Sequence, residues 1–577
     1  MRRTRLALAL SLCLPAAAQA ALPNGVAAGD VTQDSAVLWA RSDAVGALNF
    51  EVATDPGFTN VVASYGAGVG DAMQPVKALA SGLNAGTQYF YRATDSLGAS
   101  EAGSFRTPHA GGANGLRFAV TGDWRGDVMP FPAIKNIPAR NLDFMVLLGD
   151  TIYGDVGSPA VAGQATSLAD YRAKHNEVLS PTAGLNAWKD ARASTAVYAT
   201  IDDHEVTNDF AGGAHPATDA RFDNTGSFIN QTQLYRNGLQ AFGEYMPIQA
   251  QTWSGTGDAR FDGAPKLYRS QRFGDDAAMF ILDARSFRDA ELPEVADITD
   301  PAQVGAFMAA AFDPGRTMLG QAQKAQLKAD LLAAQADGTT WKFVMLPEPI
   351  QNFGPLAASD RFEGYAAERA EILKFVSDLH IDNIVFVTAD IHGTVVNNLT
   401  YQDGPFQAQK PTQAWEISTG SVGYDAPMAQ TVLYMAAQMG LIDNAIFSAF
   451  LAADVATQNL MFQGILSGLI TTYGYDPLGL DGSGIPATLL QGSWTAASTY
   501  GWSEFEIDPV SHALKVTTYG VPYYDETFAN AHPDVVAGLS PQVVSQFQVA
   551  AVPEPETYAM LLAGLGLVGW AARRRKA

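Results

Sequence analysis

Residues 197–210 read VYATIDDHEVTNDF and place Asp202, Asp203, His204 and Glu205 directly behind an apolar run. Charged residues make up only 16% of the chain, so a crowd of acids at one point needs a cause. Carboxylates at such spacing repel each other unless a positive group lies among them. The pattern therefore predicts a cation at the end of this run.

Three more apolar runs, FAVTG, MVLLG and VFVTA, are each followed directly by an aspartate. An aspartate after glycine is by itself usually a turn residue. Several unpaired carboxylates buried together would cost several kcal/mol each, so the repetition favours a shared metal centre. Carboxylate, phenol and imidazole ligands suit hard or borderline divalent and trivalent metals. The polar residues behind the four runs are Asp123, Asp150 and Tyr153, Asp203 and His204, and Asp390 and His392.

Strands that alternate with helices must position these residues. LRFAVTGD, LDFMVLLGD, AAMFILDAR, WKFVMLP and NIVFVTADIH read as buried strands, while 320–335 and 366–380 have helical spacing. This alternation indicates a layered α/β fold. Ligands bind such folds at the carboxyl ends of the strands, which is where the polar residues stand.

The chain has 577 residues and is 47% hydrophobic, which indicates more than one domain. Short alternating runs between 22 and 107 predict an all-β sandwich (domain 21–108) without chemistry of its own. HAGGANG (109–115) is the expected linker to a second domain at 109–525, which holds an insert at 427–500. Residues 526–551 are expected to form another linker.

The two ends of the chain carry sorting patterns. Residues 1–20 have a basic start, an apolar middle and Ala-Gln-Ala at the end, which predicts a secretory signal peptide. The only cysteine, Cys13, lies in it, so disulfides and thiolate ligands are excluded from the mature chain. At the other end, VPEP precedes an apolar stretch at 558–572 and a basic block at 573–576. That stretch predicts a short transmembrane segment with its basic end in the cytoplasm.

Formal net charge is −23, which argues against binding nucleic acid through bulk charge and against an anionic membrane surface. An acidic surface also repels phosphate-bearing substrates, so an enzyme acting on them needs cations at its site. Metal ions can supply them, since they clamp a phosphate and turn a bound water into hydroxide.

The motif order GDW, GDTIY, DDHE and ADIH resembles the calcineurin-like metallophosphatases, and within them the PhoD-like alkaline phosphatases. NGVAAGDVTQDSAVLWARSD, LDARSFRD, RTMLGQAQ, FEGYAAERAEIL and TADIHGT are further similar pieces, and together they span residues 23 to 525. The resemblance implies a four-layer αββα metallophosphatase domain behind a fibronectin III-like sandwich. It also implies two or more metal ions: iron and/or calcium, or other divalent metals.

The resemblance also implies roles for single residues. Asp150 would bridge two metals, and His204 would stabilise the leaving group or the transition state. Asp123 stands where PhoD-like enzymes often carry a cysteine, and MLPEPIQN (345–352) offers Glu348 or Asn352 where the superfamily has a histidine, so metal identity stays open. The implied metal ligands are Asp123, Asp150, Tyr153, Asp203, Asp390 and His392.

Residues near these motifs have two interpretations each. Arg125 holds a non-bridging phosphate oxygen, or is a surface arginine. Asn208 and Asp209 orient His204 or bind a third metal. Glu416 contacts the site from a late strand, or is a solvated strand residue.

Two further features are open at this stage. Residues 427–470 are apolar with methionines at helical spacing, which predicts a packed helical hairpin or, alternatively, a lid over the metal cleft that admits apolar leaving groups. His175 and His215 are expected on the surface.

The sequence thus predicts a secreted, metal-dependent phosphoric ester hydrolase of alkaline phosphatase D type, acting on phosphomonoesters and/or phosphodiesters. One alternative is a non-catalytic surface or matrix-binding module with a degenerate phosphatase domain; another is a phospholipase-type esterase on the same site. The C-terminal pattern resembles the PEP-CTERM sorting signal. It implies a transient membrane anchor, processing by an exosortase, and a periplasmic, outer-surface or matrix location in a Gram-negative bacterium.

Overall fold

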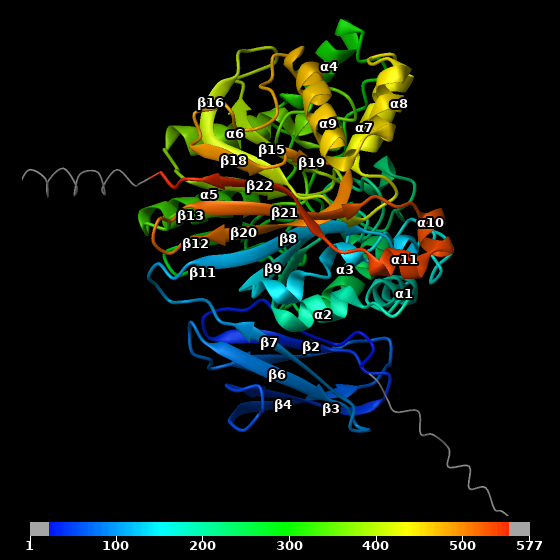
Figure 1. Ribbon diagram of the computed structural model, residues 1–577, viewed down its shortest axis with the longest axis vertical. Helices are drawn as coiled ribbons and strands as arrows, with labels where there is room; N and C mark the ends of the chain where they lie inside the picture. The colour runs from blue at the N-terminus through cyan, green and yellow to red at the C-terminus, as the bar shows by residue number, and fades with distance from the viewer. Residues whose placement is uncertain (1–21, 553–577) are drawn as a thin grey trace, which may run out of the picture.

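Two large β-sheets lie face to face at the centre of the molecule in the computed structural model, which describes residues 22–552 (Figure 1). One sheet contains, in order, β18 (Ala487–Gln491), β22 (Gln542–Val549), β21 (Leu514–Pro522), β20 (Thr499–Ile507), β8 (Leu116–Trp124), β9 (Phe144–Leu148), β10 (Ala196–Thr200), β1 (Val26–Gly29), β2 (Ser35–Ala40) and β5 (Val76–Ser81), with β17 (Ser421–Gly423) beside β8. The other contains β11 (Arg269–Phe273), β12 (Ala277–Ile281), β13 (Trp341–Met345), β14 (Ile384–Thr388), β16 (Lys410–Ser418), β15 (Thr394–Tyr401) and β19 (Thr495–Ala496).

Helices cover the outer faces of both sheets. Successive residues of a strand face opposite sides, so Phe144 and Val146 of β9 face the other sheet while Met145 and Leu147 face helices. The first sheet is covered by α1 (Leu168–Val178), α2 (Ala187–Ser194) and α3 (Gln233–Tyr245). The second is covered by α5 (Gln321–Ala336) and α6 (Ala366–Asp378), with α4 (Pro301–Ala311) beside α6. The mixed α/β prediction is confirmed, and its layers run helix, sheet, sheet, helix.

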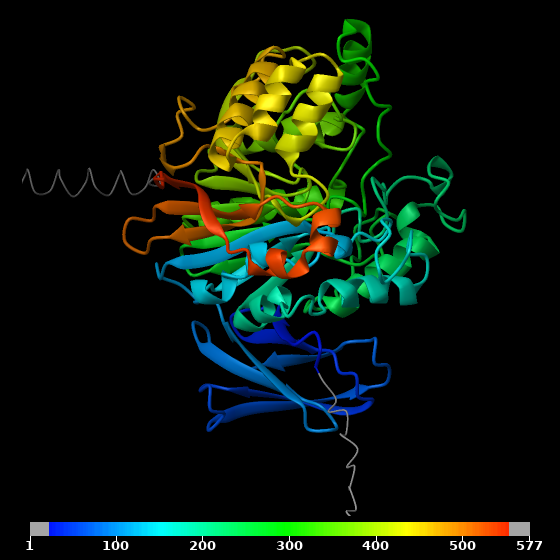
Figure 2. The same cartoon turned by 45° about the vertical axis from the view of Figure 1, so that its right-hand side comes forward.

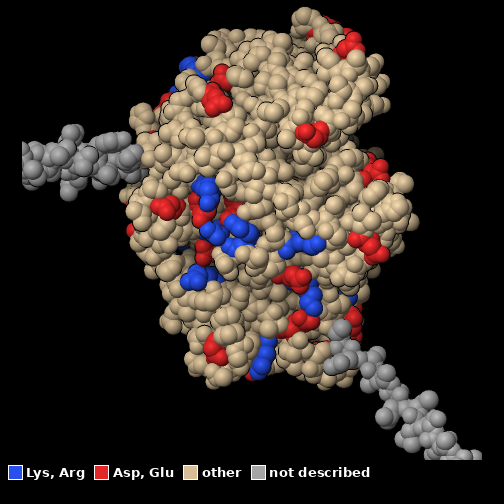
Figure 3. Space-filling view, viewed as in Figure 1, with Lys and Arg blue, Asp and Glu red and all other residues tan. Residues whose placement is uncertain are grey.

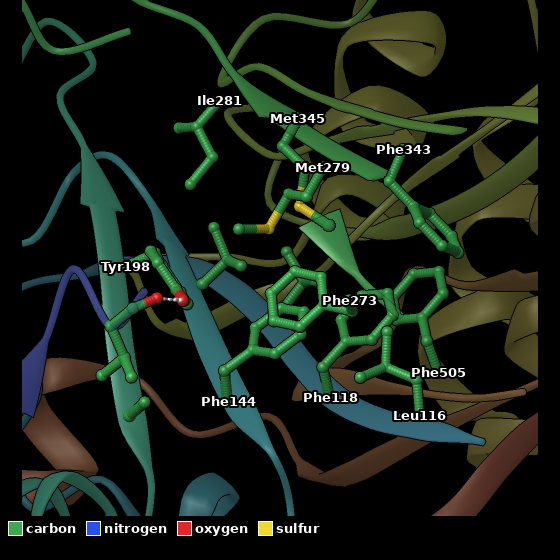
Figure 4. Packing of buried hydrophobic residues seen from close by; sticks show 14 of the residues in the cluster. Leu116, Phe118, Phe144, Tyr198, Phe273, Met279, Ile281, Phe343, Met345 and Phe505 are labelled. Atoms are coloured by element: carbon green, nitrogen blue, oxygen red, sulfur yellow. Dashed lines mark hydrogen bonds between the residues drawn. The ribbon is translucent and has the colours of Figure 1, made fainter. Parts of the chain in front are cut away.

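Aromatic rings fill the space between the two sheets (Figure 4). The Phe118 ring stacks on Phe144 at 4.7 Å and on Phe505 at 4.8 Å between centroids, and Phe343 meets its edge at 5.0 Å. Such offset and edge contacts add to the burial energy of the rings. This core fixes the distance between the sheets, and with it the relative positions of the loops at their edges.

The N-terminal strands form the lower body in Figures 1 and 2. A four-stranded sheet, β4 (Val61–Val69), β3 (Gly46–Ala53), β6 (Gln88–Thr94) and β7 (Ser100–Arg106), shares a core with β1, β2 and β5. The predicted two layers of strands are present. However, β1 also pairs with β10 (Ala28 opposite Ala196), so one layer continues into the central sheet. The fibronectin III-like topology stays a prediction.

The linker predicted at 526–551 is wrong. This segment forms α10 (Glu526–Ala531), α11 (Pro533–Gly538) and β22, and β22 pairs with both β21 and β18. The side chains of Phe547 and Val549 are buried in the core between the sheets. Their burial makes the strand part of the fold rather than a spacer before the C-terminal end.

The predicted signal peptide and the apolar stretch at 558–572 lie outside the described residues. Within residues 22–552, no helix has both the length and the apolar character needed to cross a bilayer.

The apolar segment 427–470 forms three helices rather than a hairpin: α7 (Met428–Gln438), α8 (Asn444–Ala452) and α9 (Val455–Thr471). Phe450 and Phe462 are buried in a core of their own. Asp443 and Asp454 cap α8 and α9, and the region over the helices in Figure 3 shows few charged side chains. The helices pack on this core, as the first interpretation predicted, but three helices replace the hairpin, and the lid stays a prediction.

His175 is not on the surface, whereas His215 is exposed as expected. The His175 ring stacks on Tyr245 at 5.2 Å, and neither of its nitrogens has a hydrogen-bond partner among the described residues. Burial, with a smaller contribution from Arg192, lowers the pKa of His175 to about 3. The folded protein keeps this imidazole neutral in acid, whereas the unfolded chain binds a proton near pH 6.5.

Stability should consequently fall with pH below 6.5, because the unfolded state then binds the extra proton. At pH 5, His175 is expected to reduce the free energy of unfolding by about 2 kcal/mol relative to pH 8. His175→Phe keeps the stack and should lose this pH dependence, which urea unfolding at both pH values measures. His215→Gln is the exposed control. Equal pH sensitivity in His175→Phe and the wild type would show that the residue is not buried in this way.

Candidate metal centre

The parallel strands bring the predicted residues to one edge of the fold. β8, β9 and β10 run parallel, and so do β12, β13, β14 and β16. Asp123 ends β8, Asp150 and Asp203 follow β9 and β10, and Asp390 follows β14. Because these ends lie at the same edge, four loops meet there.

The backbone at this edge is strained. Asp123, Asp150, Asp390 and His392 have φ angles of 61°, 50°, 65° and 54°, in the left-handed region. Residues other than glycine rarely adopt it, and such strain concentrates at functional sites. The sharp turns direct the side chains inward instead of along the strands.

Asp123, Asp150 and His392 offer ligand atoms that lie within 4.8 Å of one another. Asp123 Oδ1 is 3.9 Å from His392 Nε2, and the Tyr153 hydroxyl is 3.3 Å from the same nitrogen. A second group consists of Asp150, Asp203 and His204, with the same spacing. Asp150 belongs to both groups, which is the placement expected of a carboxylate between two cations.

The chemistry of these residues fits bound cations. Asp123 Oδ2 and Asp203 Oδ1 are buried without a hydrogen-bond partner among the described residues. Burial, followed by the charge of a neighbouring aspartate, raises the pKa of Asp123 and Asp150 well above the usual range. Cations between the carboxylates would remove both penalties. Metal cations therefore fit this set of oxygen and nitrogen donors.

The two histidines differ in charge. Burial, then the positive charges of His204 and Arg125, lowers the pKa of His392 to about 3, so its imidazole is neutral, the form that binds metals. Burial also acts to lower the pKa of His204, but Asp203 and the hydrogen bond to Asp155 outweigh it and raise the pKa to about 9. The acids around His204 thus favour its protonated form, although it also belongs to the second group of possible ligands.

Asp155 was not predicted from the sequence. Its Oδ1 lies 2.6 Å from His204 Nδ1, and its Oδ2 accepts the Asn208 N–H at 3.2 Å. A carboxylate only accepts, so Nδ1 carries the hydrogen and Nε2 faces the centre. The backbone of Asn208 contacts Asp155, whereas its side chain donates to Asp209, so the role predicted for Asn208 stays a prediction. The second Gly-Asp of GDTIYGD is the signal that could have identified Asp155.

Asp390 does not join the other predicted ligands. It forms a neighbouring group with Glu348 and Asp360, also within 4.8 Å. Arg285 neutralises part of this group: its Nη2 is 2.6 Å from Glu348 Oε1 and its Nη1 is 2.7 Å from Asp360 Oδ1. Both partners stand in the chain after β13, the strand that pairs with β14.

The other acids of the DDHE motif have separate partners. Asp202 Oδ1 accepts Arg285 Nε at 2.6 Å. Glu205 accepts the backbone N–H groups of Asp150 at 3.1 Å and Asp202 at 2.8 Å, and so ties two loops together. The Asp209 N–H donates to Asp203 Oδ2 at 2.6 Å. The crowded acids thus have different roles: Asp203 is a proposed ligand, Asp202 forms an ion pair, and Glu205 holds two loops together.

Arg125 and Glu416 also differ from the expectations. Arg125 is not a free surface residue, because Asp127 binds its guanidinium (Nε to Oδ1 3.0 Å). Glu416 is buried and accepts the N–H groups of Ile350 at 3.1 Å and Gln351 at 2.6 Å. It lies outside the groups just described and fixes the loop after β13, so the solvated interpretation is wrong.

The sequence pattern of the PhoD-like phosphatase family matches residues 118–455, more than half of the chain. The chain belongs to the PhoD-like phosphatase family. The pattern of the PhoD-like N-terminal domain matches residues 8–109, and the PEP-CTERM protein-sorting motif matches residues 551–576. The family resemblance seen in the motifs is therefore confirmed.

Known relatives agree with this PhoD-like assignment. Alkaline phosphatase D of Bacillus subtilis (strain 168) is 28% identical over 411 residues, which span 65% of this chain and 65% of that protein. A solved structure of PhoD has a TM-score of 0.66 and 20% identity and covers 92% of both chains, which shows the shared fold. A purple acid phosphatase from yellow lupin (Lupinus luteus) seeds reaches a TM-score of only 0.48 at 9% identity, covering 91% of this chain and 73% of that one.

Asp155 provides a test of the His204 geometry in this PhoD-like chain. Asp155→Asn replaces the carboxylate that fixes Nδ1, and should lower the rate of phosphoric ester hydrolysis about 10- to 100-fold while bound metal stays unchanged. Asp425→Asn is the control, since Asp425 is exposed and 3.9 Å from Arg125. A rate for Asp155→Asn within twofold of the wild type would remove this role.

Proposed function

We propose that this protein is an exported, metal-dependent phosphoric ester hydrolase of the alkaline phosphatase D type. The observation that carries the proposal is the pair of side-chain groups that share Asp150 and contain buried carboxylate oxygens without partners. In our assignment Asp123, Asp150, Tyr153, Asp203 and His392 hold the metals, while Asp390 lies in the neighbouring group with Glu348 and Asp360.

Bound metals would clamp the phosphate and supply the hydroxide nucleophile. The protein supplies the remaining parts. Asp155 holds His204 so that Nε2 lies 4.0 Å from Asp150 Oδ2 and 3.9 Å from Asp203 Oδ2, at the centre. From there a protonated imidazole donates its proton to the leaving oxygen. Glu205 and Arg285 fix the loops, which lowers the cost of ordering the site.

The relative from Bacillus subtilis supports phosphoric esters as substrates. The match spans 65% of that protein. The set of ligands and the oriented His204 favour an enzyme over a matrix-binding module with a degenerate domain. Phosphomonoesters and phosphodiesters both fit a centre with two cations, and a phospholipase would use the same residues.

A substrate panel tests the function. Metal-loaded protein is given p-nitrophenyl phosphate, bis(p-nitrophenyl) phosphate, a phosphatidylcholine dispersion and, as a control, p-nitrophenyl acetate. We expect hydrolysis of at least one phosphoric ester and none of the acetate. Protein that holds its metals and hydrolyses none of the phosphoric esters would contradict the proposal and favour the matrix-binding module.

The PEP-CTERM match at 551–576 supports export with exosortase processing. We infer a signal peptide at 1–20, a transient membrane anchor near the C-terminus, and a final location in the periplasm, at the outer surface or in the extracellular matrix of a Gram-negative bacterium. Cell fractionation checks this: the wild type should be found outside the cytoplasm, and a chain lacking residues 552–577 should lose its sorting.

A further inference from the structure

Tyr424 lies beside the proposed metal centre and has no role assigned so far. It follows directly after β17, which pairs with the end of β8 (Gly423 opposite Trp124). The Arg125 N–H donates to the Gly423 carbonyl at 2.8 Å. This pairing places Tyr424 next to the loop that begins at Asp123.

The ring of Tyr424 is held on several sides. It stacks on the His392 imidazole at 3.6 Å between centroids with an angle of 23°, and lies 5.1 Å from the Tyr153 ring. The Arg125 guanidinium lies 5.4 Å from the ring centre. The Tyr500 hydroxyl donates a hydrogen bond to the Tyr424 carbonyl. These contacts leave the ring little freedom to move away from the centre.

The hydroxyl group of Tyr424, by contrast, has no hydrogen-bond partner among residues 22–552. The side chain is half-buried. A phenol has an ordinary pKa near 10, so it is protonated at neutral pH and can donate. A fixed donor near a metal centre, without a partner in the protein, suits an oxygen atom of a ligand.

The other donor expected here is partly engaged. Asp127 binds Nε and Nη2 of the Arg125 guanidinium, which leaves mainly Nη1, 3.9 Å from Asp425 Oδ2, to hold a phosphate oxygen. Tyr424 has no such competitor. Binding by its hydroxyl would break no hydrogen bond within the described chain, and a donor that is free in advance favours electrostatic help in catalysis.

We propose that Tyr424 is a further substrate-binding residue, whose hydroxyl donates a hydrogen bond to a phosphoryl oxygen of the ester. The inference rests on the proposed function. The stack on His392 positions the donor, and the charge on the phosphoryl oxygen makes the bond stronger than one between neutral groups.

Tyr424→Phe removes the hydroxyl and keeps the ring. It should lower kcat/KM for p-nitrophenyl phosphate about 10- to 100-fold, as expected for a hydrogen bond to a charged group. The inhibition constant of inorganic phosphate should rise in the same direction, because phosphate carries the same oxygens. Metal content should equal that of the wild type, since the stack on His392 remains.

Tyr523→Phe is the matched control. Tyr523 is a half-buried tyrosine packed on Tyr500 at 5.7 Å, and its hydroxyl has no hydrogen-bond partner within the described chain. This variant should behave like the wild type. The proposal is overturned if Tyr424→Phe keeps both constants within twofold of the wild type, or if it loses metal, because the phenol would then serve the metals.

Failure of the proposed function can be distinguished from failure of the role assigned to Tyr424. If the metal-loaded wild type hydrolyses no phosphoric ester, titration calorimetry with inorganic phosphate still compares the wild type with Tyr424→Phe. Phosphate binding that is at least about 10-fold weaker in the variant supports Tyr424 as an oxyanion-binding residue. Equal binding overturns the inference whatever the reaction is.

Discussion

Replacing Asp150 by asparagine is expected to abolish turnover and to remove metal from the protein in the same variant. Asp150 belongs to both ligand groups, so one substitution weakens two cation sites. Asparagine keeps the size of the side chain but offers one neutral oxygen instead of a shared negative charge. We expect a loss of roughly 10³-fold or more in the rate, since both the clamp on phosphate and the nucleophile depend on the cations.

Asp143→Asn is the control for Asp150→Asn. Asp143 stands just before β9, whereas Asp150 follows it, so the two aspartates flank the same strand. Asp143 accepts the Arg117 N–H at 2.9 Å and belongs to no ligand group found in the described chain. Metal analysis and initial rates are measured on the same preparations. A protein with Asp150→Asn that retains full metal and a near-normal rate would show that Asp150 does not bridge.

Removal of the imidazole in His204→Ala should lower the rate by about 10² to 10⁴ while the metals stay bound. The reason is the difference between the two histidines: His392 is neutral and faces Asp123, whereas Asp203 and Asp155 favour the protonated form of His204. A group that donates a proton affects the chemical step rather than the binding of metal.

A double variant and a control variant complete the test of His204. Adding Asp155→Asn to His204→Ala should cause no further loss, because Asp155 acts through the imidazole and the two changes are not independent. His215→Ala, at an exposed histidine, should have no effect. If His204→Ala loses metal in proportion to activity, His204 is a ligand and the assigned roles must be exchanged.

The positions of the main site residues could be predicted from the sequence because the relevant geometry is local. An aspartate at the end of a buried parallel strand lies at the carboxyl edge of the sheet whatever the loops do. Asp123, Asp150 and Asp203 share one sheet in this way. His392 comes from the other sheet, and the close packing of the two sheets brings it to the same point.

Contacts between distant segments could not be predicted. Asp202 and Asp203 are neighbours in the chain, yet Arg285, which follows β12, hydrogen-bonds Asp202 at 2.6 Å and lies 3.6 Å from Asp203. The Asp155 to His204 contact depends on the path of the loop after β9, and the Tyr424 stack depends on the pairing of β17 with β8. No period or spacing in the sequence encodes these pairings.

The structure of segment 526–551 differs from the predicted linker for a related reason. The segment stands between the predicted domain and the C-terminal sorting pattern, and this position favours a spacer. QVVSQFQV nevertheless forms β22, because β21 offers a free edge and Phe547 fills the core between the sheets. The apolar residues of this segment become buried only when the core between the two sheets has formed.

We assign the groups that share Asp150 to cations that the hydrolysis of phosphoric esters requires. The most direct measurement is metal content per chain by mass spectrometry, paired with turnover of p-nitrophenyl phosphate and bis(p-nitrophenyl) phosphate before chelation, after chelation and after metal is added back. We predict two or more ions per chain, loss of turnover as they are removed, and recovery when they return. Undiminished turnover by protein stripped of metal would contradict the account.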